Sequence, residues 1–485
     1  MRKIFTTNLL LLLSLNILIK PFWIFGIDRT VQNTVGAGEY GIFYTLFNFS
    51  LLLNILLDFG ITNFNNREIS RHPQLLSKYL SNLVGIKILL AIVYAFFTIS
   101  LALILGYSNR QITLLFFLIL NQFLASLILY LRSNLSGLQL FKLDSLLSVL
   151  DKAVMILICS VLLWTHIFSF RFSIEFFVLA QTGSYLVSAI VVFAIVAKKS
   201  GPVSLKMDRP FIVSTLRSSA PYALLVMLMT IYGRVDSVVI ERILPNGNVS
   251  AGIYAQAFRL LDAANMFPFL FASLLLPIFS KMIKHNASLS SFVGFSTVLL
   301  LVPVISFAIP TFTFRDHIMG LLYHEHELCS SEILGVLMGS FVFIAVGYIL
   351  GTLLTAQGDL KHLNIISAVT VAVSISIQLF LVSRFNIIGA AFGNLATNGL
   401  ATVLQLWLAF RRFRFRVDTL YIIRFAGFVG FAIFISILAD FVGINPTVAY
   451  LTACMLSFAS AFIFRLISYR ELKSFFAKDT ALKHN

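Results

Sequence analysis

The sequence predicts an all-α membrane protein that crosses the bilayer about fourteen times, as two six-helix lobes followed by two C-terminal helices. Three observations predict this class. The 485 residues are 59% hydrophobic and only 12% charged, whereas soluble domains carry about 25% charged residues. The apolar residues form runs of the length, about 20 residues, that crosses a bilayer as a helix. No stretch between these runs is long enough for a sizeable soluble domain.

A sliding window of about 20 residues finds the candidate spans in order. They are residues 5–27, 40–64, 79–106, 111–135, 144–168, 173–197, 218–243, 250–280, 288–312, 331–356, 363–383, 389–410, 419–440 and 447–468. The first resembles a signal peptide, with Arg2 and Lys3 before a leucine run, but it lacks a small-residue cleavage site at its far end. We therefore expect a retained signal anchor.

The basic residues predict the orientation of the chain. Alternate loops, counted from the N-terminus, hold 23 lysines and arginines, and the opposite loops hold 6. The positive-inside rule therefore places both termini in the cytoplasm, in agreement with an even number of spans. In a soluble protein the net charge of +16 would indicate nucleic acid, but this distribution indicates membrane topology instead.

Other chemistry finds little support. The three cysteines lie far apart and show no metal or redox spacing. The run His324-Glu325-His326-Glu327 lacks the helical i, i+4 histidine pair of a zinc site, and no Gly-x-x-x-x-Gly-Lys loop is present. We therefore expect no metal, no cofactor and no ATP-driven step within this chain, and we do not expect an enzyme.

The seventh and eighth spans carry charges where a bilayer disfavours them. These residues are Arg234, Asp236, Glu241, Arg259 and Asp262. Each costs about 2.5–3.5 kcal/mol at the bilayer centre by insertion scales, so together they indicate a polar cavity between helices. Arg259 and Asp262 are three residues apart and share a helix face, which predicts an ion pair. Arg234 is in phase with Glu241, whereas Asp236 points elsewhere on the same helix.

The remaining basic residues within spans fall into three groups. Lys20 lies deep, which favours a role facing the cavity. Arg132, Lys152 and Arg424 lie close enough to a cytoplasmic end for their long side chains to reach the interface. Lys87 lies about three turns inside its span, and its position is compatible with either interpretation.

A short motif that occurs twice in the chain, called the internal echo below, predicts two lobes. Gly38-Glu39-Tyr40-Gly41 precedes the second span, and Gly252-Ile253-Tyr254-Ala255 stands at the start of the eighth. Both place a Gly-x-Tyr-small element at the outer mouth of the corresponding helix. Secondary transporters often consist of two such halves with the substrate site between them. We expect an N-terminal lobe at 1–205, a C-terminal lobe at 206–416, and two further spans with a cytoplasmic tail at 417–485.

A set of short motifs is spread along the chain: Gly-x-x-Tyr-Gly, Asp-x-Gly and Arg-Glu within residues 36–71, Ala220-Pro221, Arg234-x-Asp236, Gly252-Ile253-Tyr254, Arg259-Leu260, Leu276-Pro277 and Ile387-Ile388-Gly389-Ala390-Ala391. These motifs resemble those of Wzx-type polysaccharide flippases in the multidrug/oligosaccharidyl-lipid/polysaccharide (MOP) exporter superfamily. They are spread over most of the chain and are less specific for one substrate than for the superfamily.

This resemblance implies a flippase in the bacterial inner membrane. Its substrate would be an undecaprenyl-diphosphate-linked oligosaccharide, moved by alternating access within the MOP fold, with polysaccharide polymerase and chain-length proteins as partners beside the membrane lipids. Arg259 matches a cavity arginine of related lipid II flippases, and Asp58, Asp236 and Asp262 match acidic positions of the pattern. Coupling to Na⁺ or H⁺ carries over only loosely. The expected translocation site therefore comprises Arg259, Arg234, Asp262, Asp236, Lys20 and Asp58.

Two alternatives remain open at this point. A drug or cation exporter of the same superfamily would have an acidic, aromatic cavity, and the deep Arg234, Arg259 and Lys20 argue against it. A membrane-embedded glycan polymerase or ligase would present a sizeable outer loop with basic catalytic residues, and the outer loops here are short.

Overall fold

The chain folds as helices joined by short connections. The computed structural model describes residues 15, 18–165, 172–200, 209–284, 289–413, 415 and 419–466, and no strand occurs among them. The chain divides into two compact units, Met1–Gln256 and Ala257–Asn485. The division falls inside a single helix, α10, so its first ten residues belong to the first unit.

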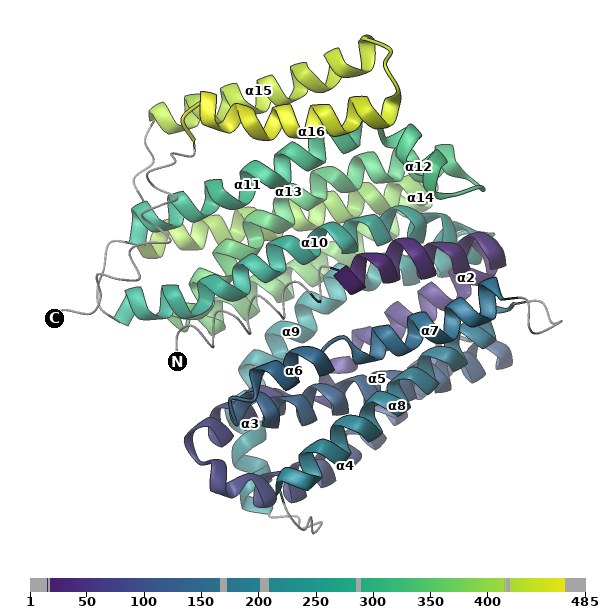
Figure 1. The fold of residues 1–485 in the computed structure, drawn as a ribbon, viewed down its shortest axis with the longest axis vertical. Helices are drawn as coiled ribbons and strands as arrows, with labels where there is room; N and C mark the ends of the chain where they lie inside the picture. The colour runs from purple at the N-terminus through teal and green to yellow at the C-terminus, as the bar shows by residue number, and fades with distance from the viewer. Residues whose placement is uncertain are drawn as a thin grey trace. The chain divides into compact units, whose positions relative to one another are not determined.

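The first unit contains the helices from η1 to α9 and the start of α10 (Figure 1). In chain order they are η1 (Trp23–Asp28), α2 (Arg29–Leu52), η2 (Asn54–Leu57), α3 (Ile61–Arg71), η3 (Pro73–Leu75), α4 (Leu76–Ile104), α5 (Asn109–Gly137), α6 (Phe141–Leu147), α7 (Leu150–Trp164), α8 (Ile174–Ser200), α9 (Arg209–Ile243) and α10 (Gly247–Lys284).

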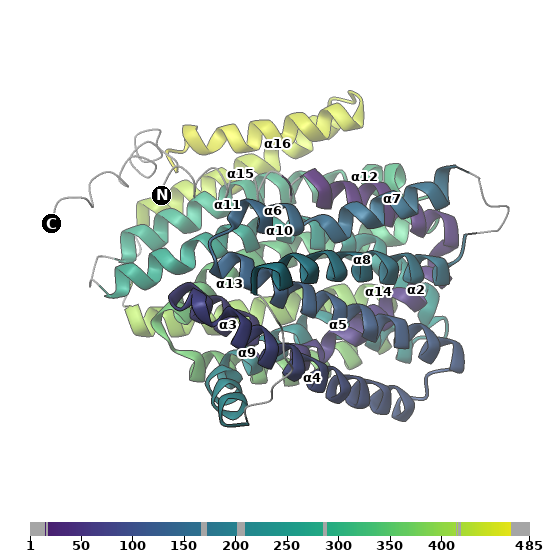
Figure 2. The ribbon, with the colours of Figure 1, turned by 60° about the horizontal axis from the view of Figure 1, so that its bottom comes forward.

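Helix α5 is the centre of the first unit. It packs against α8, α3, α2 and α4, and α5 and α8 run side by side in Figure 2. Leu83, Leu124, Leu131 and Val192 belong to the apolar core that these helices share. This core lies beside the break in the second membrane segment that is described below.

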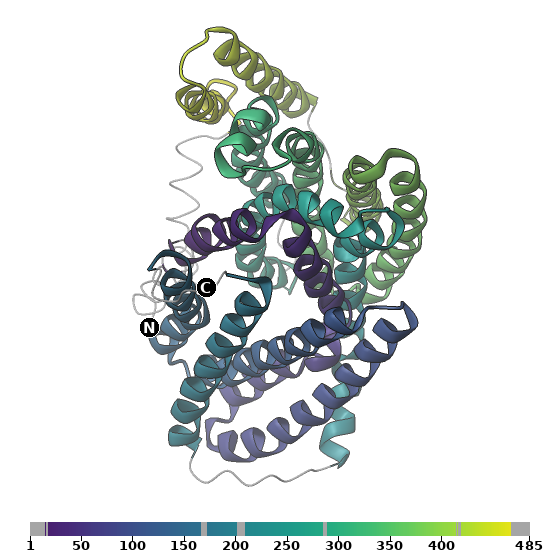
Figure 3. The same cartoon turned by 90° about the vertical axis from the view of Figure 1, so that its right-hand side faces the viewer.

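The first two membrane segments meet without a connecting loop. Gly36 has φ 81° and ψ 166°, a conformation that breaks α2 and that a residue with a Cβ rarely adopts. The change of direction is visible in Figure 3, where the purple N-terminal helix bends. The predicted loop at 28–39 is therefore helical on both sides of one residue, because a glycine alone is sufficient for the bend.

The second unit contains the rest of α10 and the helices from α11 to α16. These are α11 (Leu289–Thr313), α12 (Arg315–Leu322), α13 (Glu327–Gln357), α14 (Leu360–Phe413), α15 (Thr419–Phe441) and α16 (Pro446–Ile463). Helix α13 packs against α14 and α11, and the pair α15–α16 packs on α11 through both of its members (Figure 1). Ala449 and Ala453 of α16 are buried close to Phe314, since small residues let helices approach closely.

Helix α14 is two membrane segments in one. Asn386 has φ 55° and ψ −141°, which breaks the helix, and the chain folds back directly. The turn is tight, because a Cβ on Gly389 would lie 2.1 Å from the carbonyl oxygen of Leu381. Gln378 Nε2 donates to the carbonyl oxygen of Ala390 at 3.2 Å across the two halves. The break matches the predicted separation of spans 363–383 and 389–410.

The chain is a multi-pass membrane protein. Within the described residues, eleven helices have the length and hydropathy needed to cross a membrane, and α14 counts once among them. The second half of α14 and the two segments on either side of Gly36 add further passes. The total agrees approximately with the fourteen spans predicted.

Candidate functional site

The second membrane segment is interrupted at Asp58. Helix η2 ends at Leu57, Phe59 and Gly60 have φ values of 47° and 80°, and α3 then begins at Ile61. The break leaves a helix C-terminus and a helix N-terminus close together inside the membrane, and backbone groups there need partners. The side chain of Asp58 supplies one of them, because it accepts from the backbone N–H of Thr62 at 3.3 Å and from the Thr62 hydroxyl.

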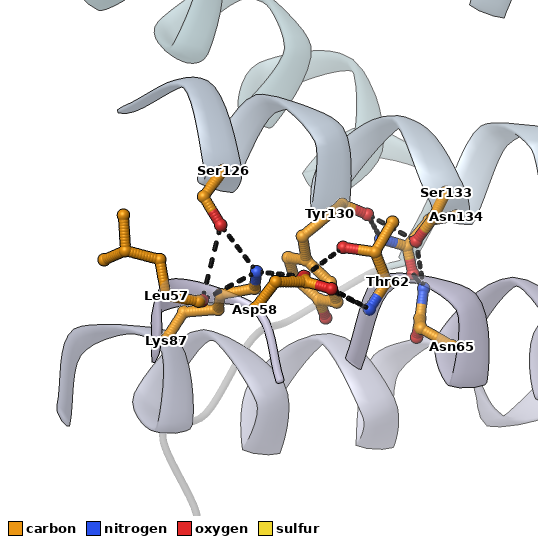
Figure 4. A network of polar contacts seen from close by, with 9 residues as sticks. All are labelled: Leu57, Asp58, Thr62, Asn65, Lys87, Ser126, Tyr130, Ser133 and Asn134. Atoms are coloured by element: carbon orange, nitrogen blue, oxygen red, sulfur yellow. Dashed lines mark hydrogen bonds and ion pairs between the residues drawn. The ribbon is translucent and has the colours of Figure 1, made fainter. Parts of the chain in front are cut away.

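Lys87 of α4 supplies the opposite charge at this break (Figure 4). Its Nζ lies 2.5 Å from Asp58 Oδ1, 3.0 Å from the carbonyl oxygen of Leu57 and 2.8 Å from Ser126 Oγ. The side chain of Lys87 is fully buried, whereas that of Asp58 is 27% exposed. The ammonium also faces the ring of Tyr130 at 5.9 Å. The structure therefore shows Lys87 in a buried ion pair, so its side chain does not extend to the interface, and an ion pair was not among the interpretations left open for it.

A second polar contact holds α3 on α5. Asn65 Nδ2 donates to Ser133 Oγ at 2.8 Å and to Asn134 Oδ1 at 3.0 Å (Figure 4). All three side chains are buried. The α3 half of the interrupted segment is therefore fixed to α5 by side-chain hydrogen bonds as well as by apolar packing.

The two tyrosines of the internal echo make the same contact. Tyr40 donates its hydroxyl to both carboxylate oxygens of Asp28, at 2.9 and 2.8 Å. Tyr254 donates to Asp236 Oδ2 at 2.5 Å. All four side chains are buried. Each pair joins an aspartate on one helix to the tyrosine at the start of the next.

The glycines of the echo lie at one helix crossing in the first unit. A Cβ on Gly41 would lie 1.8 Å from the carbonyl oxygen of Asn248, and one on Gly252 would lie 1.9 Å from that of Ala37. Backbone atoms of α2 and the start of α10 therefore touch where the two Asp–Tyr pairs are formed. Small residues allow such close approach within membranes.

Arg234 and Asp236 sit in this region, with different surroundings. Asp236 is 2% exposed and its carboxylate is bound by Tyr254. Arg234 is half-buried and interacts electrostatically with Tyr254. Glu241, near the end of α9, pairs with Arg242 at 2.8 Å and accepts from Gln111 Nε2 at 3.0 Å. The Glu241 carboxylate therefore binds neighbouring side chains near the end of α9.

Arg259 and Asp262 form the expected pair in the second unit. Arg259 Nη1 lies 3.9 Å from Asp262 Oδ2, with side-chain exposures of 16% and 19%. At this separation the two groups form an ion pair at the outer limit of the distance range for a salt bridge. Both groups sit on α10, six residues or fewer after the division between the units.

Lys20 belongs to a cluster of charges in the first unit. Its electrostatic neighbours are Asp151, Lys152 and Arg132. Lys152 pairs with Asp151 at 3.0 Å and faces the ring of Tyr185 at 5.0 Å. The ammonium of Lys152 is therefore enclosed by side chains and does not extend to the interface as predicted. Arg132 is paired in the same region, with Asp144 Oδ1 at 2.8 Å from its Nε.

The prediction for Arg132 and Lys152 is corrected on physical grounds. Both side chains are only about one-fifth exposed, at 17% and 22%. Each has an aspartate and, for Lys152, an aromatic ring within reach, and these interactions replace water at the interface. The sequence held a signal for this, because an aspartate immediately precedes Lys152 and another begins the same predicted span.

Sequence reasoning missed Asp28 and left Lys87 undecided. Asp28 was assigned to a loop, although the echo pairs each mouth tyrosine with a preceding helix that could carry an acid. Asp58 and Lys87 lie at similar distances from the facing ends of the predicted spans 40–64 and 79–106, which could have predicted their contact. Among the residues that the structure describes, no group of three or more His, Cys, Asp or Glu side chains could hold a metal ion.

Comparison with known proteins places this arrangement in a family. A family model described as polysaccharide biosynthesis protein matches residues 7–283, more than half of the chain. No curated protein matches the sequence significantly.

Solved structures with the same fold are transporters. The lipid II flippase MurJ in an inward closed conformation has a TM-score of 0.72 and 16% identity, covering 96% of this chain and 99% of its own. A multidrug resistance MATE family transporter of the MOP superfamily, in an inward-facing conformation, has a TM-score of 0.63 and 15% identity, covering 83% and 94%. A MOP superfamily transporter from Pyrococcus furiosus, whose binding pocket is described as having reverse polarity, has 0.57 and 15%, covering 84% and 94%. The chain therefore belongs to the polysaccharide biosynthesis protein family and has the fold of the MOP superfamily transporters.

Proposed function

We propose that this protein is a flippase, and not an enzyme, that moves an undecaprenyl-diphosphate-linked oligosaccharide from the cytoplasmic to the outer leaflet. The lipid tail stays in the bilayer while the head group crosses through the protein by alternating access of two lobes, at 1–205 and 206–416. Family membership supports a role in polysaccharide synthesis. The structural likeness to a lipid II flippase supports a lipid-linked substrate.

The meeting of three basic groups around Lys20 within predicted membrane segments is the observation that carries the proposal. Among the described residues of the first unit, Lys20, Arg132 and Lys152 interact with the carboxylates of Asp144 and Asp151, so three basic groups meet two acidic ones in these contacts. A diphosphate in a low-dielectric cavity needs fixed positive charges and hydrogen-bond donors. The positive charges suit a phosphate and repel a cation, and the Trp23 and Tyr185 rings hold the Lys152 ammonium by cation–π contacts.

Arg259 is the residue that we expect to contact the diphosphate first. Its planar guanidinium can donate two parallel hydrogen bonds to phosphate oxygens. Asp262, at 3.9 Å, orients the guanidinium before the substrate binds, and the phosphate oxygens then replace its carboxylate as the partner of Arg259. Arg234 and Lys20 add positive charge along the proposed route of the diphosphate through the protein. Asp236 and Asp58 complete the proposed site through the groups they hold, Tyr254 and Lys87.

The cationic interior also weighs against the two alternatives. A drug exporter for organic cations requires a net acidic cavity, the opposite of the charge balance around Lys20. A polymerase or ligase requires catalytic side chains on an outer loop. The outer segment 313–330 contains the short helix α12, whose Asp316 is bound by Ser331 and whose Arg315 is held by the Phe312 carbonyl.

The test replaces Arg259 by alanine in a bacterial strain that lacks the chromosomal gene. We expect Arg259→Ala to insert at the wild-type level and to lose surface polysaccharide, with lipid-linked repeat units accumulating on the cytoplasmic leaflet of the inner membrane. Arg384→Ala is the matched control, because Arg384 lies exposed beside the break in α14. We expect this control to export normally.

The leaflet that holds the intermediate separates the possible functions. Unpolymerised repeat units on the outer leaflet of the deletion strain would identify a polymerase. Normal polysaccharide in Arg259→Ala at normal protein level would refute the assignment of Arg259. The same strain, with reporter tags on each end of the chain, tests the expected cytoplasmic location of both termini. Co-purification with the polymerase and chain-length proteins tests the expected partners.

A further inference from the structure

The break in the second membrane segment forms a small cage of oxygen atoms. Its members are the carbonyl oxygen of Leu57, Oδ1 of Asp58 and Oγ of Ser126. They come from the end of η2, the break itself and α5. Their distances to one central atom are 3.0, 2.5 and 2.8 Å, and that atom is Nζ of Lys87.

The Lys87 ammonium matches this cage both in its positive charge and in its number of hydrogen-bond donors. Lysine has three N–H donors and no acceptor, and three oxygen atoms receive them here. The Leu57 carbonyl belongs to a helix C-terminus, the negative end of the helix dipole. Asp58 caps the N-terminus of the following helix through Thr62. The Lys87–Asp58 pair thus meets the needs of both half-helix ends at the break.

Carbonyl oxygens at the ends of broken membrane helices, joined by a carboxylate, are the ligands with which transporters bind Na⁺. We propose that the Lys87 ammonium is a tethered cation that fills a monovalent-cation site at this break, so that the site binds no exchangeable ion in the wild-type protein. When Lys87 is replaced by an uncharged side chain, the cage of Leu57, Asp58 and Ser126 binds Na⁺.

The exposure of the two partners determines how an ion reaches the site. Asp58 is 27% exposed while Lys87 is fully buried. The carboxylate is therefore partly accessible from outside the protein, whereas the lysine, which comes from α4, is covered by protein on all sides. An ion from solution would approach from the side of Asp58, which Lys87 does not cover. Asp58 accordingly holds the fixed charge of the Lys87 ammonium. An ion that drives transport would therefore bind at another site.

The test measures thermal stability of the purified protein in detergent, in NaCl and in choline chloride at equal ionic strength. For Lys87→Met we expect a lowered Tm in choline chloride that NaCl raises saturably, by about 5 °C at 100-fold excess over Kd. The wild-type protein should have the same Tm in both salts, because Lys87 already occupies the site. The double variant Lys87→Met/Asp58→Asn should fold and should have lost the dependence on Na⁺, because neither charge remains.

Lys78→Met is the matched control, since Lys78 lies exposed on the same helix. Its Tm should equal that of the wild type in both salts. Two results would overturn the proposal. One is a Lys87→Met protein that has the same Tm in NaCl and in choline chloride. The same conclusion would follow if Lys87→Met failed to fold in both salts while the double variant folded. The other is a saturable Na⁺ stabilisation of the wild type that Asp58→Asn abolishes.

Discussion

Replacing Gly252 by alanine tests the helix crossing at which the internal echo is centred. The new Cβ would lie 1.9 Å from the carbonyl oxygen of Ala37, and Cβ atoms essentially never approach another atom within 3.0 Å. The backbones of α2 and α10 would therefore have to separate by about 1.1 Å. The atom that the new Cβ meets belongs to helix backbone and alanine has no alternative rotamer, so a rotamer change cannot relieve the contact.

Overpacking of this kind costs about 1–3 kcal/mol. The methyl group recovers about 0.4–1 kcal/mol at most through reduced freedom of the unfolded chain. We expect Gly252→Ala to lower the Tm of the detergent-purified protein by several degrees, monitored by size-exclusion chromatography after heating. Gly233→Ala is the control, because a Cβ at Gly233 meets no atom within 4 Å. Equal Tm values for the two variants would refute the close crossing.

Two further predictions follow from individual contacts. Tyr40→Phe and Tyr254→Phe each leave a buried carboxylate without its hydroxyl donor, at a cost of about 1–3 kcal/mol, and an unchanged Tm in either variant would contradict the contact. In the connection before α14, burial raises the pKa of the Asp359 carboxyl, but hydrogen bonds from His362 and Arg412 outweigh it and the pKa is lowered. This stability is present above the ordinary carboxyl pKa and is lost as pH falls through the lowered value. Asp359→Asn should therefore cost about 0.5–1 kcal/mol at pH 7, discounted for the half-exposed partners, and its Tm should converge with that of the wild type as the pH falls below the lowered pKa of Asp359.

The sequence predicted the fold well because membrane helices depend on hydropathy and length, which one sequence displays directly. Spans such as 331–356 correspond closely to α13, Glu327–Gln357. Connections were predicted less well. Gly36 and Asn386 each reverse or bend the chain at one residue, and hydropathy does not distinguish a bend at one residue from a short loop. The interruption at Asp58 was likewise invisible, since residues on both sides of it are apolar.

The charged residues were recognised as unusual but their partners were predicted only within one helix. Arg259 and Asp262 are three residues apart, so helical geometry predicted the pair. Lys87 and Asp58 are separated by 29 residues, and Tyr254 and Asp236 by 18. Such contacts depend on how helices pack, and packing of apolar surfaces leaves many registers open to a single sequence.

The two Asp–Tyr pairs show what the internal echo preserves. Asp28 lies 12 residues before Tyr40, but Asp236 lies 18 before Tyr254, so no constant offset aligns both members. The difference arises because the first pair spans a bend at a single glycine, whereas the second spans a helix end and a turn. What recurs is a contact: a buried carboxylate held by a hydroxyl beside a glycine crossing. The Tyr254 hydroxyl donates to one carboxylate oxygen of Asp236, so we expect that protonation of Asp236 would weaken this hydrogen bond and favour release of the hydroxyl. A Tyr254→Phe protein whose export changes its dependence on pH, at normal protein level, would show that release; a loss of stability with an unchanged pH profile would confine Asp236 to the crossing.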